Sequence, residues 1–223
     1  QRFMQFLKER YVTVQALKRD FETPAATWDE LGQLTTLYSQ KTAGAYSVRA
    51  AWSGEVARAY FSVSNAILRE LDPNHLNLGV RFVSQLVPRS VITVAGQYVD
   101  VMSVNFYDLS GRMAQNMTQM DPDYLPIDED LLAHFEAGRR PILISEWGFR
   151  AADSGLPNSY PPEWFYPTLA TQKERADAYE TKMRRVLSRS WIVGAHWFEY
   201  IDEPPEGRRS EEHTSELQSH HDL

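Results

Sequence analysis

Residues 141–149 read PILISEWGF, an apolar run that ends in one carboxylate, Glu146, followed by an aromatic residue and a glycine. Four consecutive apolar residues, bounded by a proline and Gly148, predict a strand buried on both faces, as in a parallel sheet. Glu146 then lies at the carboxyl end of that strand, which is the edge where parallel α/β folds and (β/α)8 barrels build their active sites. A solvated loop glutamate is the alternative, but such a residue would gain nothing from Trp147 and Gly148. Glu146 is therefore the first candidate for a functional residue.

A second strand-like segment, residues 191–200 (WIVGAHWFEY), is rich in aromatic residues and is stopped by Pro204 and Pro205. Alternation places Trp197 and Glu199 on one face of this strand. An indole at a strand end is a natural platform for a sugar ring, although a tryptophan in the core is equally common. Either face of this segment is thus a candidate to line a pocket.

A third segment, residues 99–108, turns polar at its end, and alternation aligns Asn105 with Tyr107 on one face. A tyrosine there can donate its hydroxyl proton to a neighbouring carboxylate and hold it ionised and oriented. A fourth segment, residues 72–82, begins with an Asp-Pro-Asn turn and leads into a strand that ends near Arg81. These polar strand ends are expected to meet Glu146 at one edge of the sheet.

Helical patterns separate the strands. Residues 56–71, 128–137 and 171–187 each carry apolar positions at helical spacing, whereas 83–98 is the weakest helix because it contains Pro88 and many β-branched residues. Alternation of helices and strands argues for parallel βαβ units, and hence for the α/β class. The apolar stripe of the first helix consists of Val56, Ala59, Tyr60, Val63, Ile67 and Leu71.

Composition excludes several classes of function. The net charge is −7 and no basic stripe offers phosphates a footprint, so no nucleic-acid partner is expected. No apolar run approaches the roughly 20 residues of a membrane span, so no membrane partner is expected. His75, His134 and His196 lack metal-ligand spacing, and nucleotide-binding or serine-hydrolase motifs are missing from the sequence, so no metal and no cofactor is predicted. The absence of cysteine leaves the compartment open, with a lean to a secreted or periplasmic location, and the oligomeric state is also open.

The two ends of the chain indicate a fragment. Residues 1–7 read as the middle of a helix, and residues 209–223 resemble the in-frame translation of a sequencing adapter, as in an assembled metagenomic fragment. The expected organisation is one partial barrel domain over residues 1–208 and a non-native tail over 209–223.

Taken together, the four strand-like segments resemble strands five to eight of a clan A glycoside hydrolase, that is, the C-terminal half of a TIM (β/α)8 barrel. Within the clan, the sequence is most similar to β-agarases and β-galactosidase-like enzymes of families 42 and 50. The resemblance implies that Glu146 in ISEWGF is the catalytic nucleophile, that Tyr107 in SVNFY touches and orients it, and that Trp197 in GAHWFEY is an active-site tryptophan. It further implies a carbohydrate substrate. Further substrate-binding candidates are Asn105, Trp147, Glu199, Arg81 and Trp164, the last in a long loop after Glu146.

The implied activity is hydrolysis of β-glycosidic bonds of oligo- or polysaccharides with retention of configuration. Such enzymes need two carboxyl groups roughly 5 Å apart. The clan places its acid/base at the end of strand four, upstream of Gln1, so this fragment alone is expected to be inactive. Two alternatives stay open: a non-catalytic carbohydrate-binding barrel module, and a barrel enzyme for phosphorylated substrates, which would need a glycine-rich phosphate loop late in the barrel.

Overall fold

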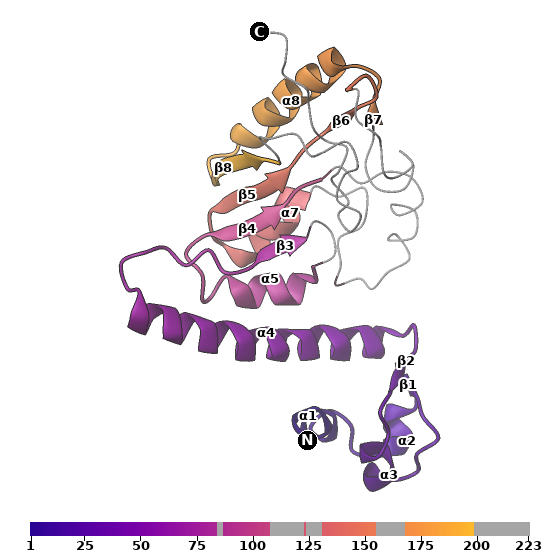
Figure 1. The fold of residues 1–223 in the computed structure, drawn as a ribbon. Helices are drawn as coiled ribbons and strands as arrows, with labels where there is room; N and C mark the ends of the chain where they lie inside the picture. Colours follow the sequence, from indigo (N-terminus) through magenta and orange to yellow (C-terminus); the bar gives the residue numbers. More distant parts are fainter. Residues whose placement is uncertain (84–86, 108–122, 124–130, 155–167, 199–223) are drawn as a thin grey trace.

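This computed structural model describes residues 1–83, 87–107, 123, 131–154 and 168–198. At its centre is a four-stranded sheet in which the strands lie side by side in chain order and are all parallel. Its arrows all point the same way in Figure 1. The α/β class with a parallel sheet is thus confirmed. Two candidate residues, Trp164 and Glu199, and the tail 209–223 lie outside the described residues. The four strands are β3 (Arg81–Val83), β4 (Met102–Asn105), β5 (Ile142–Trp147) and β8 (Ile192–Trp197).

Helices precede and separate these strands: α4 (Ala43–Leu71), α5 (Arg89–Ala95), α7 (Leu131–Phe135) with the short η2 (Glu136–Gly138), and α8 (Gln172–Leu187). The helix predicted over 171–187 is confirmed, and the Thr171 hydroxyl caps it by accepting from the Glu174 N–H. Pro88 stands at the N-cap of α5, where its missing N–H costs no helical hydrogen bond. Pro88, which weakened the prediction of this helix, is therefore the residue at which the helix begins.

The predicted strand over 72–82 is shorter than expected, because only Arg81–Val83 pairs with the sheet. Gly79 adopts a left-handed backbone with φ of 67°, and the Asn77 side chain accepts a hydrogen bond from its N–H. An added Cβ at Gly79 would lie 2.7 Å from Val99, so this turn requires glycine. The segment before β3 is thus irregular, and its last turn, at Gly79, lies two residues before Arg81.

The main core fills the side of the sheet that faces the helices. One buried cluster contains Ile144 of β5, Phe61 of α4 and Val186 of α8. Helices α4 and α8 therefore pack into the same core as the sheet. Sheet residues whose side chains point into this cluster are Phe82, Met102, Val104, Ile142, Ile144 and Ile192.

A register shift in β5 changes the face on which Glu146 lies. Ile144 pairs with Val104, but the next residue of β4, Asn105, pairs with Glu146, so β5 contains one extra residue. Strict alternation would have put Glu146 on the same face as Ile144. A bulge adds one residue and so moves the following side chain to the other face. The extra residue turns Glu146 away from the helix-facing core and onto the face of Asn105.

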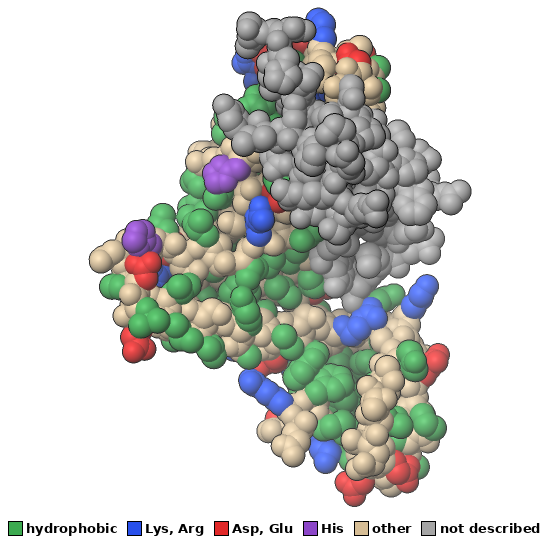
Figure 2. All heavy atoms as spheres, in the orientation of Figure 1, with side chains coloured by type: hydrophobic (Ala, Val, Ile, Leu, Met, Phe, Trp, Pro, Cys, Tyr) green, Lys and Arg blue, Asp and Glu red, His purple; other side chains and the backbone are tan. Residues whose placement is uncertain are grey.

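The apolar stripe predicted for α4 does not face the core. Five of its members, Val56, Tyr60, Val63, Ile67 and Leu71, are 50–76% exposed. The buried positions of α4 are instead small or lie on the opposite side of the helix: Ala45, Val48, Gly54, Ala57 and Phe61. Apolar side chains gather along α4 in the space-filling view of Figure 2. Periodicity identified the helix correctly but not the face that this structure buries.

A second core lies on the other side of α4 from the sheet, as Figure 1 shows. It is built from α1 (Arg2–Lys8), α2 (Val14–Leu17), α3 (Trp28–Gly32) and the antiparallel pair β1 (Phe21–Glu22) and β2 (Tyr38–Ser39). Near the site, β6 (Arg150–Ala151) pairs in parallel with β7 (Thr168–Leu169) and brings together the two ends of the predicted long loop.

Candidate active site

Glu146 of β5 is held by two side chains, Arg81 of β3 and Tyr107, which follows β4. The Tyr107 hydroxyl donates to Glu146 Oε1 at 2.9 Å, and Arg81 Nη1 donates to Oε2 at 2.7 Å. Glu146 is 6% exposed, whereas the Arg81 side chain is 54% exposed. The predicted contact between Tyr107 and Glu146 is confirmed.

The parallel register explains why these residues meet. Arg81 pairs with Ser103, and Asn105 and Tyr107 follow Ser103 at steps of two, so all four point to one face. The bulge in β5 brings Glu146 to the same face beside Asn105. Backbone bonding fixes this alignment, because the Phe106 N–H donates to the Glu146 carbonyl at 2.7 Å. The site therefore forms at the carboxyl ends of β4 and β5, and Arg81 reaches it from the first position of the short strand β3.

Asn105 lies beside the acidic residue, as its assignment to the site requires. It is half-buried, and its Oδ1 is 3.4 Å from the Ser145 hydroxyl. This distance is long for a hydroxyl hydrogen bond, so the contact with Ser145 is weak.

Arg81 was a sugar-contact candidate in the sequence, and its ion pair with Glu146 was not foreseen. A cation at 2.7 Å favours the ionised form of a carboxylate, and a donated hydroxyl proton adds to this preference. The arrangement thus holds Glu146 as an oriented anion. The sequence placed Arg81 near the end of a strand, whereas in the structure it begins β3, next to the strand that leads to Tyr107.

Trp147 does not line an open sugar site. Its ring is 1% exposed and packs at 5.0 Å from Tyr179 of α8 and at 5.0 Å, edge to face, from Trp197. The interpretation of Trp147 as a sugar contact is therefore corrected: its indole fills the core between β5 and α8. The reason is the bulge, which sends Glu146 to one face and the next residue to the other.

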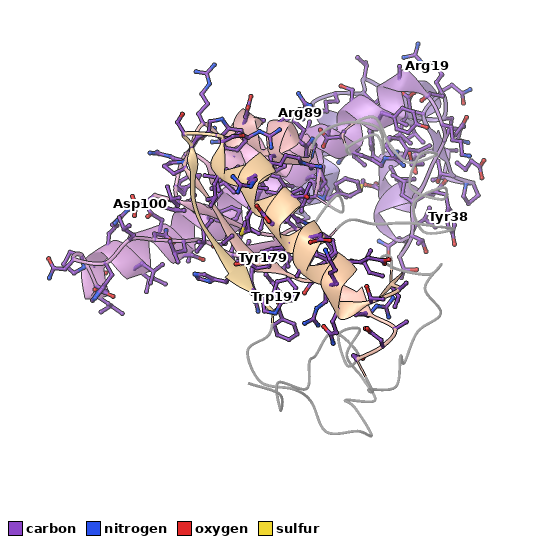
Figure 3. The ribbon with its side chains drawn as sticks, turned by 90° about the horizontal axis from the view of Figure 1, so that it is seen from above. Arg19, Tyr38, Arg89, Asp100, Tyr179 and Trp197 are labelled. Atoms are coloured by element: carbon purple, nitrogen blue, oxygen red, sulfur yellow. The ribbon has the colours of Figure 1, made fainter. Side chains whose placement is uncertain are left out.

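Trp197 lies at the same end of the sheet as Glu146, as expected, because it pairs in register with Trp147. It is half-buried, and its ring lies 5.4 Å from Tyr179, its neighbour in Figure 3. These two rings help to line a surface pocket of about 390 Å³ together with Gln172, Arg175 and Ala176. In this structure the indole turns toward α8 rather than toward Glu146.

Within the described ranges, no group of three or more His, Cys, Asp or Glu side chains is placed to hold a metal ion. The same part of the chain contains no helix that is both long and apolar enough to cross a membrane.

Comparison with known proteins points to one group. No family model matches the chain. It is 31% identical over 206 residues to β-agarase B and 34% identical over 208 residues to β-agarase A, both from Vibrio sp. (strain JT0107). Each alignment covers 92% of this chain, but only 20% and 19% of those proteins. The chain thus spans about a fifth of the length of the curated relatives it matches.

Solved structures agree with the sequence comparison. An agarase, AgWH50C, superposes with a TM-score of 0.68 at 28% identity, over 97% of this chain and 27% of the agarase. PfGH50B gives a TM-score of 0.70 at 28% identity, over 97% of this chain and 29% of that protein. An exo-β-agarase gives 0.67 at 28% identity, over 92% of this chain and 26% of that enzyme. In sequence and in fold, the chain is therefore β-agarase-like, similar to part of these glycoside hydrolases.

Proposed function

We propose that residues 1–208 form the C-terminal half of the (β/α)8 barrel of a retaining glycoside hydrolase that cleaves β-glycosidic bonds in agar-type polysaccharides. The observation that carries this proposal is the Glu146 carboxylate at the carboxyl end of β5, held by Tyr107 at the end of β4 and by Arg81 of β3. The similarity to β-agarases over 92% of the chain supports the substrate class.

In the proposed mechanism, Glu146 is the nucleophile. One of its oxygens attacks the anomeric carbon as the glycosidic bond breaks, giving a covalent glycosyl-enzyme that water then hydrolyses. Tyr107 orients the carboxylate, and Arg81 favours its charged form before the sugar arrives. As positive charge develops on the sugar ring, the buried carboxylate stabilises it in a site of low dielectric.

The second carboxyl group of the mechanism protonates the leaving oxygen and must lie roughly 5 Å from the nucleophile. We propose that it comes from outside this sequence, at the end of a strand that would lie beside β3. On this proposal the chain by itself is inactive. Asn105 and Arg81 are the sugar contacts on the face of Glu146, while Trp164, Glu199 and Trp197 remain proposed contacts.

The test is a chimera in which residues 1–208 replace the matching segment of β-agarase B. The chimera should hydrolyse agar oligosaccharides. Glu146→Gly in this chimera should lose turnover, and added azide should restore turnover of an activated β-glycoside and give a glycosyl azide of inverted configuration. The reason is that the small anion occupies the face that the carboxylate has vacated.

Other outcomes are equally informative. A retained-configuration azide would mark Glu146 as the acid/base and exchange the two roles. Unchanged turnover in Glu146→Gly would remove it from catalysis altogether.

A carbohydrate-binding module without catalysis is the second candidate, and the pocket at Trp197 and Tyr179 favours it. Aromatic rings with amide and guanidinium groups can bind a sugar without any acid or base. In that case the chimera would bind agar oligosaccharides but show no turnover, and Glu146→Gln would leave binding unchanged.

A further inference from the structure

Lys182 is a buried lysine directly behind the candidate active site. It lies on α8, and only 5% of it is exposed. The core-facing positions of α8 are Arg175, Lys182 and Val186, so a cation stands where an amphipathic helix normally places an apolar residue. Burying an ammonium is costly unless polar or aromatic groups surround it.

The surroundings of Lys182 suit a cation. Its Nζ donates to the Phe106 carbonyl at 2.7 Å and lies 4.1 Å from the centre of the Phe106 ring. Two further rings face it, Trp147 at 5.4 Å and Phe149 at 5.3 Å. A desolvated ammonium near aromatic rings gains cation–π attraction as well as its hydrogen bond.

Two of the residues that Lys182 contacts are sequence neighbours of Tyr107 and Glu146. Phe106 directly precedes Tyr107, and Trp147 directly follows Glu146. The peptide of Phe106 is bonded on both sides, since its N–H donates to the Glu146 carbonyl at 2.7 Å and its C=O accepts from Lys182. The ammonium thus holds the peptide that precedes Tyr107 and lies against the ring that follows Glu146.

We propose that Lys182 is a positioning residue for the glycosidase reaction, holding the Phe106–Tyr107 backbone so that the Tyr107 hydroxyl meets Glu146. This inference rests on the proposed function of Glu146. The group acts through β4 and β5 and does not touch the sugar. The groups that bond the Glu146 carboxylate itself are Arg81 of β3 and the hydroxyl of Tyr107, on the other face of the sheet.

The first experiment compares Lys182→Met with Lys173→Met in the chimera. Methionine keeps the length and apolar stem of lysine but removes the ammonium. We expect kcat to fall roughly ten- to a hundredfold with KM changed by less than about threefold, because displaced catalytic groups cost rate more than binding. Lys182→Arg, which keeps a buried cation and donor, should recover part of kcat. Lys173 is the matched control on the same helix, because its side chain is 83% exposed and pairs with Asp177 on the next turn, so its replacement should change neither constant.

The second experiment needs no turnover. In the whole 223-residue chain, the titration of the Glu146 carboxyl is followed by carbon NMR of labelled glutamate and assigned with Glu146→Gln. Lys182→Met should raise the pKa of Glu146, since a displaced Tyr107 hydroxyl supports the charged carboxylate less well. An inactive chimera with this NMR shift would refute the proposed function and keep the placement of Lys182. A lowered melting temperature with unchanged kcat and unchanged titration would overturn the inference and leave Lys182 a purely structural residue.

Discussion

Two carboxylates in this molecule each accept a hydrogen bond from a tyrosine hydroxyl, Asp20 from Tyr11 at 2.8 Å and Glu146 from Tyr107 at 2.9 Å. Their second oxygens differ. That of Asp20 accepts from the Thr42 hydroxyl, whereas that of Glu146 meets the half-exposed guanidinium of Arg81. The same pair of groups therefore serves two environments: a half-buried aspartate bonded to two hydroxyl groups, and a buried glutamate bonded to one hydroxyl group and one guanidinium.

The surroundings of Asp20 indicate a structural role. The Thr42 Oγ also accepts from the Ala45 N–H, so the hydroxyl that donates to Asp20 is the N-cap of α4. An added Cβ on Gly44 would lie 2.5 Å from both Asp20 carboxylate oxygens, so a larger residue there would displace the carboxylate. The bond from Thr42, followed by that from Tyr11, holds the pKa of Asp20 below its usual value. Burial first, and then Asp20, raises the pKa of Tyr11. Asp20 thus connects α2 to the start of α4.

The largest expected effect is the difference in kcat between variants of Glu146 and variants of Asp20. In the chimera, Glu146→Gln should lower kcat by roughly four orders of magnitude with KM nearly unchanged, because it removes the attacking anion and keeps the shape. Asp20→Asn should leave kcat per folded molecule unchanged and lower the free energy of unfolding by about 1–2 kcal/mol. Steady-state kinetics and urea denaturation of both variants measure these effects. A comparable loss of kcat in the two variants would erase the distinction between the sites.

The sequence predicted much of the surroundings of Glu146. The apolar run before Glu146 indicated a buried parallel strand, and alternation placed Asn105 and Tyr107 together. It missed the bulge in β5, because one extra residue in a ladder leaves no mark in the pattern of apolar residues. Trp147 was therefore assigned to the wrong surface.

Long-range contacts explain the other omissions. The pairing of Lys182 with Phe106 joins residues 76 positions apart, and that of Arg81 with Glu146 joins residues 65 apart. Neither follows from local spacing. On α4, periodicity cannot distinguish a stripe that packs against the sheet from one that stays exposed, as Val63 and Ile67 do at 60% and 50% exposure.

A smaller effect compares the two tyrosines. Tyr107→Phe in the chimera should lower kcat by roughly ten- to a hundredfold, because Glu146 loses a donor that orients it while the ring still fills its site. Tyr11→Phe should leave kcat unchanged and lower the free energy of unfolding by about 1 kcal/mol. Kinetics and thermal melting of both proteins provide the measurement. If Tyr107→Phe altered only the melting temperature, the two hydroxyls would have the same structural role.

The smallest effect is a pH dependence of stability that belongs to Asp20. Because the pKa of Asp20 is lower in the folded protein than its ordinary 3.8, folding favours the ionised form. Its contribution to stability is therefore complete above the unfolded pKa and is lost as pH falls through the folded pKa. The difference in unfolding free energy between the parent chain and Asp20→Asn, about 1–2 kcal/mol at neutral pH, should stay constant down to about pH 5 and shrink below about pH 4.

Asp177→Asn is the matched control, since Asp177 pairs with Lys173 on an exposed helix surface and should contribute less than about 0.5 kcal/mol at any pH. Urea denaturation across this pH range tests the prediction, and a difference that persisted unchanged at the lowest pH would show that Asp20 stabilises the fold through its shape rather than its charge.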